Sequence, residues 1–297
     1  MNNRVIVTGG AGFIGSYVTK LLCDEGYETI VYDNLSSGKI DNIDKRAIFI
    51  KGNITDLSLL RNTIKEGDCV IHMAAIVSVP ISIEEPYSTF NTNVVGFASV
   101  LEVCRLKKAK GIILSSSAAV YGENEGTQEE NNPKNPNTPY GVHKLQDEEL
   151  ATLYSKVYGL NTISLRYFNV YGKGHHETGS YAPVIAKFLK QKKDNSPFTI
   201  IGDGLQTRDF IHVKDVANAN VCALKVIEKG ESGIYNICSG VSHTIVNIAK
   251  MIDLKRNTQN LPARTEIRTS CGKNTLAKNK LNWEPTIALE EGVRELL

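Results

Sequence analysis

The chain has 297 residues, of which 41% are hydrophobic and 22% are charged, and its formal net charge is +2. This length suffices for one large domain or two small ones with a packed core. Because the charge balance is nearly neutral and no long basic run occurs, the composition argues against a nucleic-acid partner held by phosphate neutralisation.

Cysteine, histidine and hydropathy patterns argue against further classes. The six cysteines and six histidines show no metal-ligand spacing, so we expect free thiols and no bound metal. No apolar stretch is long enough to span a bilayer, and strand-like residues begin directly after Arg4, which leaves no room for a signal peptide. We therefore expect a soluble cytoplasmic protein without a membrane partner.

Short β-branched runs alternate with helical patterns in the first half of the chain. Six runs are typical of strands buried on both faces: residues 5–7, 29–32, 47–50, 69–71, 111–114 and 162–165. Between the first two, helical spacing is kept by Ile14, Val18, Leu21 and Leu22, and Gly26 ends the helix. This order predicts an α/β fold, a doubly wound parallel sheet with helices on both faces.

The pattern changes beyond residue 165. Loops become longer and more polar at residues 172–180 and 193–197, and residues 261–268 mix acidic and basic side chains without periodicity. Residues 233–237 are typical of one more buried strand. We therefore expect one domain over residues 1–165 and a smaller part over residues 166–297, with some chain crossing back to the sheet.

Three glycines follow the first predicted strand. Gly9, Gly12 and Gly15 lie between that strand and an amphipathic helix, where backbone can approach a pyrophosphate at the helix amino terminus. Asp33 ends the second predicted strand, 18 residues after Gly15. A carboxylate there accepts both adenosine ribose hydroxyls and repels a 2′-phosphate, which predicts NAD rather than NADP. The alternative is an aspartate that serves only the turn over residues 33–38.

A tyrosine, a lysine and a serine form the candidate catalytic set. Thr138 and Pro139 are typical of a helix start, so Tyr140 and Lys144 fall one turn apart on one helix face. A nearby ammonium favours the phenolate, which can then exchange a proton with a substrate. Ser117 ends the fifth predicted strand, at the sheet edge that lines ligand crevices in such folds. The alternatives are a surface pair and a polar strand end without a ligand.

Taken together, the motifs resemble the extended short-chain dehydrogenase/reductase family, in its branch of NAD-dependent nucleotide-sugar epimerases and dehydratases. The resemblance covers nearly the whole chain and is carried by TGGAGFIG (8–15), DNLSSGK (33–39), HMAA (72–75), SSSAAVYG (115–122), YGVHK (140–144), LRYFNVYG (165–172) and GDGLQTRDFIHVKDV (202–216). It implies a Rossmann-type NAD-binding domain and a smaller carboxyl-terminal substrate domain.

The resemblance also implies a reaction. Dehydratases of the family carry an acidic residue after the serine of the fifth strand, where this chain has Ala118 and Ala119, so the sequence is closer to the UDP-sugar 4-epimerases. In that reaction Tyr140 takes the proton of the sugar 4-hydroxyl, bound NAD oxidises C4 transiently, Ser117 steadies the 4-oxygen, and Lys144 holds the nicotinamide ribose. The alternatives are another epimerase, a decarboxylase, a dehydratase or a reductase of the same family, or a catalytically silent NAD-binding regulator.

Cofactor contacts are implied residue by residue. The glycine loop and the segment after the second strand supply Gly9, Gly12, Phe13, Ile14, Gly15, Asp33, Asn34, Ser36, Ser37 and Gly38. Asn53 and Ile54 fall beside the adenine. The remaining contacts are Met73, Ala74, Ala75, Val77, Asn93, Ser115, Tyr140, Lys144, Tyr167 and Phe168. Val77 stands where related enzymes often have a lysine, so one phosphate contact is expected to be missing.

The substrate contacts implied in the same way are Ser78, Ser117, Tyr140, Asn169, Ala182, Val184, Thr199, Arg208, Glu266 and Ser270. Arg208 offers the fork that suits a pyrophosphate, with a surface ion pair to Asp209 as the alternative. Either Arg264 or Arg268 supplies a further cation. Lys273 replaces the aspartate that is common in the family, and the sequence offers no physical account of that change.

Two expectations concern assembly and the sugar. Apolar stripes on the helix around residues 91–106 and on the helix after Lys144 imply a homodimer through a four-helix bundle, unless both stripes face only their own sheet. Residues 78–83 resemble epimerases of N-acetylated UDP-hexosamines. Ser270 aligns where a tyrosine excludes an N-acetyl group, so UDP-N-acetylglucosamine and UDP-glucose are both expected as substrates.

Overall fold

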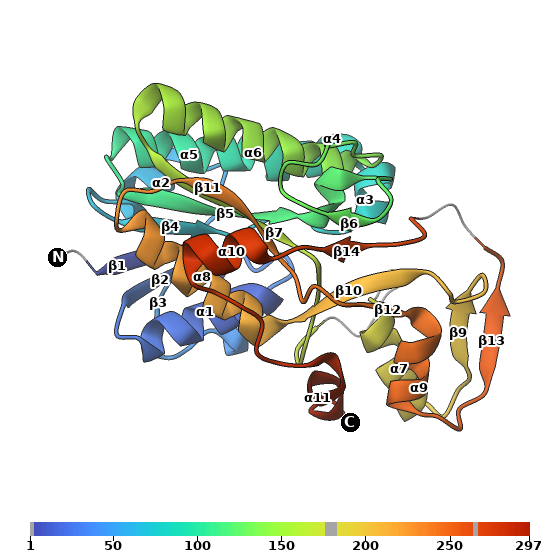
Figure 1. The fold of residues 1–297 in the computed structure, drawn as a ribbon. Helices are drawn as coiled ribbons and strands as arrows, with labels where there is room; N and C mark the ends of the chain where they lie inside the picture. The colour runs from blue at the N-terminus through green and yellow to red at the C-terminus, as the bar shows by residue number, and fades with distance from the viewer. Residues whose placement is uncertain (1–2, 176–182, 264–266) are drawn as a thin grey trace.

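A computed structural model describes residues 3–175, 183–263 and 267–297. Its centre is a seven-stranded parallel sheet in the order β11-β7-β5-β4-β1-β2-β3 (Figure 1). The strands are β1 (Arg4–Thr8), β2 (Glu28–Asp33), β3 (Ile48–Lys51), β4 (Cys69–His72), β5 (Gly111–Ser117), β7 (Asn161–Tyr167) and β11 (Gly233–Ile237). All seven predicted runs lie in this sheet, with the third shifted by one residue, so the predicted fold class is confirmed.

Helices cover both faces of the sheet, because successive strand side chains point to opposite sides. On one face, Val5 and Val7 pack with α1 (Phe13–Asp24) and α8 (Val213–Ile227). On the other, Ile6 packs with α2 (Leu57–Thr63), α5 (Gly96–Leu106) and α6 (Pro139–Tyr158). Both α1 and α6 begin beyond the carboxyl ends of strands, so their amino termini face the same edge of the sheet.

The segment between β4 and α5 is helical in short pieces. It contains α3 (Val79–Glu84), α4 (Pro86–Phe90) and a π-helical turn over Asn91–Val95. The helix expected around residues 91–106 therefore begins with a wider turn before the regular α5. Asn93 is buried within that turn, and single π-turns are frequent at functional sites.

The second part of the chain adds smaller sheets. Strands β12 (Ser242–Thr244), β10 (Thr207–His212) and β8 (Asn169–Tyr171) form one, and β9 (Phe198–Ile201) pairs with β13 (Thr258–Leu261). A third core cluster lies between these strands and α7 (Val184–Lys193), α9 (Ile245–Ile252) and α11 (Leu289–Arg294). In Figure 1 this part sits beside one end of the large sheet.

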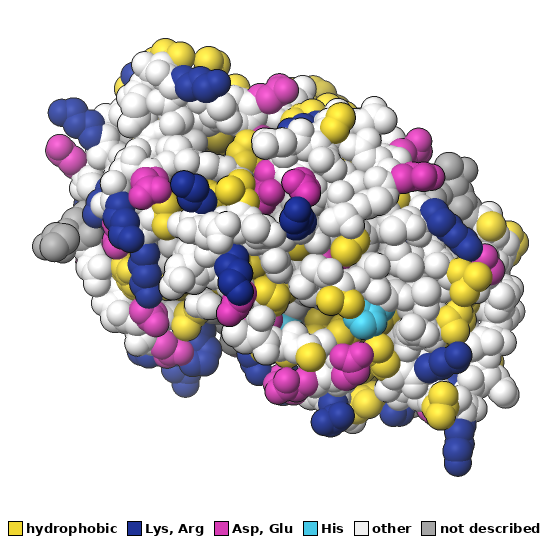
Figure 2. All heavy atoms as spheres, in the orientation of Figure 1, with side chains coloured by type: hydrophobic (Ala, Val, Ile, Leu, Met, Phe, Trp, Pro, Cys, Tyr) yellow, Lys and Arg dark blue, Asp and Glu magenta, His cyan; other side chains and the backbone are white. Residues whose placement is uncertain are grey.

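Chain from the second half also serves the first. Strand β11 is the edge strand of the large sheet, and helices α8 and α10 (Thr275–Leu281) pack on that sheet. In addition, β6 (Thr127–Gln128) pairs with β14 (Cys271–Gly272). On the face seen in Figure 2, acidic and basic side chains are interspersed. All six cysteines are free, and no helix of the described residues is both long and apolar enough to cross a membrane.

Candidate active site

The glycine loop joins β1 to α1 and makes room for a ligand at the helix start. A Cβ on Gly15 would lie 2.2 Å from the carbonyl oxygen of Gly9, and one on Gly9 would lie 2.6 Å from the backbone N of Ala74. Gly9 also has a φ of +73°, which L side chains rarely adopt. Gly12 is the N-cap residue and has no side chain to cover the first N–H groups of α1. Such a terminus favours a phosphate anion.

Asp33 is held beside this loop by both of its carboxylate oxygens. Oδ2 accepts a hydrogen bond from the backbone N of Ala11 at 3.0 Å, and Oδ1 accepts one from the backbone N of Leu35 at 2.8 Å. The backbone N of Lys39 donates to Ala11 O at 3.1 Å. The segment that contains Asn34, Ser36, Ser37 and Gly38 therefore folds against the glycine loop.

The segment expected beside the adenine begins with a turn at Asn53. Asn53 Oδ1 already accepts hydrogen bonds from Thr55, from its backbone N at 3.1 Å and its Oγ1 at 3.0 Å. The side-chain oxygen of Asn53 therefore closes a local turn with Thr55. Ile54 is buried in the core, with its side chain against Gly96.

The segment after β4 is fixed from two sides. The backbone N of Met73 donates to Thr8 O at 3.0 Å, and that of Ala74 donates to Thr8 Oγ1 at 3.3 Å. Asn93 Oδ1 accepts from the backbone N of Ile76 at 2.8 Å, while Nδ2 donates to Ile76 O at 3.0 Å. Val77 follows with 66% of its surface exposed. Asn93 thus shapes the predicted ribose and pyrophosphate side of the site through its backbone partner.

Helix α6 places Tyr140 and Lys144 against the end of β5. The side chain of Thr138 accepts from the backbone N of Gly141 at 3.2 Å, as its predicted capping role requires. A Cβ on Gly141 would lie 2.7 Å from the carbonyl oxygen of Ala119, so the start of α6 packs tightly on the turn after Ser117. Tyr140 is further held because its backbone N donates to Ser82 Oγ at 3.1 Å.

Ser117 and Lys144 occupy different surroundings within this constellation. Ser117 Oγ accepts from the backbone N of Ala119 at 3.1 Å and so caps the short turn Ala118–Tyr121. Its hydroxyl hydrogen still remains for donation to a substrate oxygen. Lys144 is only 2% exposed, and its Nζ lies 3.6 Å from Asp147 Oδ2. Sequence reasoning missed Asp147, although its spacing from Lys144 puts both on one helix face.

Two predicted cofactor residues bind each other in the interior. Ser115 Oγ lies 3.2 Å from Tyr167 Oη, which also accepts from Asn220 Nδ2 at 2.8 Å. Burial raises the pKa of Tyr167 to about 12. This phenol therefore stays protonated at neutral pH, and sequence reasoning had not singled out its partner Asn220.

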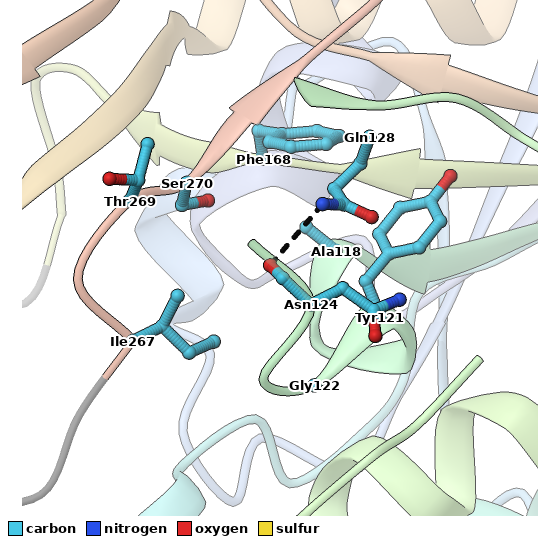
Figure 3. Close-up of a pocket in the computed structure, with 9 residues that line it drawn as sticks. All are labelled: Ala118, Tyr121, Gly122, Asn124, Gln128, Phe168, Ile267, Thr269 and Ser270. Carbon is cyan, nitrogen blue, oxygen red and sulfur yellow. Dashed lines mark hydrogen bonds between the residues drawn. The ribbon is translucent and has the colours of Figure 1, made fainter. Parts of the chain in front are cut away.

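A small hollow, partly open to solvent, lies between the turn after β5 and the chain before β14. It is lined by Ala118, Tyr121, Gly122, Asn124, Gln128, Phe168, Ile267, Thr269 and Ser270 (Figure 3). Of the predicted residues, Phe168 and Ser270 meet here. The hydroxyl of Ser270 points toward the hollow, whereas that of Thr269 points away. No motif had singled out Gln128 or Asn124.

The predicted nucleotide-binding residues lie on neighbouring strands. Asn169 on β8 donates to Asp209 O at 2.8 Å, and Arg208 on β10 donates to Ile267 O at 2.8 Å. The carboxylate of Asp209 accepts from Ser239 and from the backbone N of Gly240 and Gly272. Because adjacent strand residues point to opposite faces, Asp209 is turned away from Arg208, which argues against the alternative ion pair.

Other predicted substrate residues are more dispersed. Thr199 on β9 is half-buried and accepts from Gln191 Nε2 at 2.9 Å, and Val184 begins α7. Arg268 forms two hydrogen bonds with the carboxylate of Asp203, at 2.8 and 2.7 Å. Ala182, Arg264 and Glu266 lie outside the described residues.

The contacts of Lys273 give a physical reason for a lysine at this position. Its Nζ donates to Glu129 Oε1 at 2.8 Å, and its backbone N donates to Gln128 O at 3.0 Å. Both bonds reinforce the pairing of β14 with β6. Lys273 therefore links the strand that follows Ser270 to the segment around β6.

Histidines take no metal-binding arrangement in the described part of the chain, where no cluster of metal-ligating side chains occurs. His72 is 1% exposed and its Nδ1 lies 2.9 Å from Thr8 Oγ1. Burial lowers its pKa to about 3, so the ring is neutral at physiological pH. His72 is the last residue of the buried strand β4 and has a structural role there.

Comparison with known proteins decides the family. The family model described as NAD dependent epimerase/dehydratase family matches residues 5–238. The chain belongs to this family. It is 37% identical to a putative UDP-glucose 4-epimerase of Methanocaldococcus jannaschii, over 99% of this chain and 97% of that protein.

Two solved structures are similar throughout. One is a UDP-glucose 4-epimerase with UDP-glucose from Thermotoga maritima, with a TM-score of 0.91, 36% identity, and coverage of 98% of this chain and 96% of that one. The other is a UDP-N-acetylglucosamine 4-epimerase from Methanobrevibacter ruminantium in complex with UDP-N-acetylmuramic acid. Its TM-score is 0.93 and its identity 34%, over 99% of this chain and 96% of that one.

Proposed function

We propose that this protein is an NAD-dependent UDP-sugar 4-epimerase that interconverts UDP-glucose with UDP-galactose and UDP-N-acetylglucosamine with UDP-N-acetylgalactosamine. The observation that carries the proposal is the placement of Tyr140 and Lys144 on α6, whose start packs against the turn after Ser117. These groups, the glycine loop and Asp33 all follow carboxyl ends of strands in one parallel sheet. That edge is where open α/β folds bind nucleotides.

The residues present fit NAD. Backbone crowding at Gly9 and Gly15 leaves no room for side chains, and the uncapped start of α1 offers N–H groups to a pyrophosphate. The oriented carboxylate of Asp33 suits the adenosine ribose hydroxyls. When bound, NAD supplies a hydride acceptor and donor for the sugar C4. We assign residues 1–165 mainly to this cofactor and residues 166–297 mainly to the substrate.

The catalytic work falls to three side chains. Tyr140, as phenolate, takes the proton from the sugar 4-hydroxyl and returns it to the 4-oxygen once the keto sugar has turned its opposite face toward the cofactor. Lys144 keeps positive charge one helical turn away, which favours that phenolate. Ser117 donates its hydroxyl hydrogen to the 4-oxygen, while its Oγ accepts a hydrogen bond from the backbone N of Ala119. Asn169 and Arg208 lie on adjacent strands, where the fork of Arg208 suits the substrate pyrophosphate.

The alternative reactions of the family are less well supported. Elimination of water needs an acid after the strand-end serine, and the turn there consists of Ala118, Ala119, Val120 and Tyr121. A decarboxylase or reductase remains the second candidate enzyme, and a silent NAD-binding regulator would not need Tyr140 and Lys144 together. Incubation with UDP-glucose, UDP-N-acetylglucosamine and UDP-glucuronate, with products read by NMR, separates these cases. Epimer pairs without net NADH support the proposal, whereas a released keto sugar or net NADH refutes it.

We further propose a homodimer that works in the cytoplasm. Part of the two apolar stripes does face the protein's own sheet, because Val100 and Leu101 are buried in the core. Apolar side chains nevertheless remain exposed on the adjacent helices α5 and α6: Leu106, Val142, Leu153, Val157 and Tyr158. Free thiols suit a reducing compartment. A monomeric mass in light scattering at micromolar concentration would refute the dimer.

A further inference from the structure

Helix α6 carries three functional groups in one row. Tyr140, Lys144 and Asp147 are spaced by four and three residues, so they lie above one another on a single face. Lys144 is 2% exposed and Asp147 is not exposed at all. Their charged groups are 3.6 Å apart, between Nζ and Oδ2. The row therefore continues into the interior and ends on a carboxylate.

Asp147 differs from its neighbour Glu148, which is equally buried. Glu148 accepts hydrogen bonds from Ser116 Oγ and from Arg166, at 2.9 Å to Nε and 2.7 Å to Nη2. Neither carboxylate oxygen of Asp147 has a hydrogen-bond partner among the described residues. Glu148 thus has its own cation, and the ammonium of Lys144 is the one paired with Asp147. A buried carboxylate with no hydrogen bond is costly, and such groups concentrate at functional sites.

We propose that Asp147 is the counter-ion of Lys144 and a positioning residue for the Tyr140–Lys144 pair. The inference rests on the proposed function, since it concerns the proton transfer assigned to Tyr140. Asp147 holds the Lys144 ammonium in a buried place where desolvation alone would disfavour its charge. Its own negative charge also offsets part of the field that Lys144 exerts on Tyr140. The two effects together set the pH range in which the pair is active.

Among the titratable groups around Lys144, Asp147 is the one whose protonation changes near neutral pH. Burial raises the pKa of its carboxyl to about 7, against the attraction of Lys144 and with a smaller contribution from Glu148. His72 on β4 and His143 on α6 also face Lys144, and burial lowers the pKa of each ring. Both rings are therefore neutral where Asp147 ionises. The field at Lys144 consequently responds to Asp147 between mildly acidic and mildly basic pH.

Removal of the negative charge of Asp147 should shift the protonation of Tyr140 and Lys144 in a defined direction. It favours the deprotonated form of both neighbours, because a nearby anion stabilises a bound proton. In Asp147→Asn the basic limb of the kcat/KM profile should therefore move to lower pH by about one unit or more, whereas the acidic limb should move less, because Asp147 is largely protonated there in wild type. A purely structural role would lower stability or overall activity and leave both limbs in place.

The experiment compares NAD-loaded wild type with three variants over a range from about pH 5 to pH 10, which spans the ordinary pKa values of the groups concerned. Asp147→Asn should shift the profile. Asp147→Glu, which keeps the charge, should restore the limbs toward the wild-type positions. Glu149→Gln removes a carboxylate from an exposed position on the same helix and serves as the matched control. The proposal is overturned if Asp147→Asn and Glu149→Gln give the same limbs as wild type.

A second measurement does not depend on activity or on the folding of Asp147→Asn. Infrared difference spectra of the NAD-loaded protein between about pH 5 and pH 9 report the loss of a protonated carboxyl band. In Lys144→Met, which lacks the ammonium, the buried-carboxyl band should persist to higher pH than in wild type. Equal titration in both proteins overturns the pairing. If the carboxyl band is lost at lower pH in wild type than in Lys144→Met but wild type epimerises no UDP-sugar, the proposed function is refuted and the Lys144–Asp147 pair is supported.

Discussion

The side chain of Asn93 closes two hydrogen bonds with the backbone of Ile76, at 2.8 Å to its N and 3.0 Å to its O. Asn93 is 1% exposed, so both bonds are sheltered from water. They join the π-helical turn before α5 to the segment after β4. A side chain far from the glycine loop in sequence thus fixes a backbone on which cofactor binding is predicted to depend.

We expect wild type to be purified with NAD bound and to need none added. Asn93→Ala would leave the N–H and C=O groups of Ile76 without partners, a loss of roughly 1–3 kcal/mol for each buried group. The variant should retain less NAD and unfold at a lower temperature, as measured by nucleotide release and thermal denaturation. Ser99→Ala, at a half-buried position of α5 where a hydrogen bond to Val95 O is lost, is the matched control. Full NAD retention in Asn93→Ala, or NADP as the released nucleotide from wild type, would contradict the assignment.

Tyr140→Phe should lower turnover by at least about 10²-fold, because it removes the positioned proton carrier. The backbone bond from Tyr140 to Ser82 survives this change, so the helix start and UDP-sugar binding should persist. Steady-state kinetics and calorimetric binding measure the two effects separately. Tyr154→Phe on the same helix, which loses only its contact with Glu102, should keep near-normal turnover. Wild-type rates in Tyr140→Phe would place the proton transfer elsewhere.

Acid should destabilise the protein through His72. Burial lowers the pKa of this ring from 6.5 to about 3, so the unfolded chain binds a proton that the folded chain resists. The stability is complete above pH 6.5 and is lost as pH falls, by about 1.4 kcal/mol for each unit down to about pH 3. In His72→Asn the unfolding free energy should be lower at neutral pH but should decline less steeply below pH 6.5. Urea titrations across this range test the slope, and parallel curves would be inconsistent with it.

The sequence predicted the large sheet because each strand is a continuous apolar run, the pattern of strands covered on both sides. Residues 233–237 were placed among them for the same reason, although they lie far along the chain. The pairing of β11 with β7 could not be predicted, since it depends on the route of the chain through β8, β10 and α8. Short pairs such as β6 with β14 are likewise fixed by tertiary contact and carry no periodic signal.

The candidate site was predictable where the backbone conformation requires a particular residue type or where two side chains require a fixed spacing. Examples are the glycines at 9, 12 and 15 and the spacing of Tyr140 and Lys144. Asp147 was hidden, because a run of three acids over residues 147–149 reads as a solvated surface. Only the folded helix separates them, with Asp147 and Glu148 inside and Glu149 outside. The choice between two arginines was equally beyond the sequence, and Arg268 binds Asp203 in the structure.

The choice of sugar is predicted to depend on Ser270. Its backbone N donates to Thr207 O at 3.1 Å, and Thr207 and Thr269 form a bridge, so the position of its side chain is fixed. The hydroxyl points into the hollow that Phe168 also lines (Figure 3). A serine leaves space there for an N-acetyl group and a hydroxyl to meet it, whereas a tyrosine would fill that space.

We therefore expect wild type to epimerise UDP-N-acetylglucosamine and, since a pocket cannot strongly reject a smaller ligand, UDP-glucose as well. Ser270→Tyr should lose most kcat/KM for the N-acetylated substrate and keep that for UDP-glucose. Ser270→Ala retains the space but not the hydroxyl, so it should cost the N-acetylated substrate about 0.5–1.5 kcal/mol, the net value of one hydrogen bond. The two substrates serve as mutual controls for folding, because a misfolded variant loses both. An inert UDP-N-acetylglucosamine in wild type, or full activity on it in Ser270→Tyr, would show that another residue sets the space beside C2.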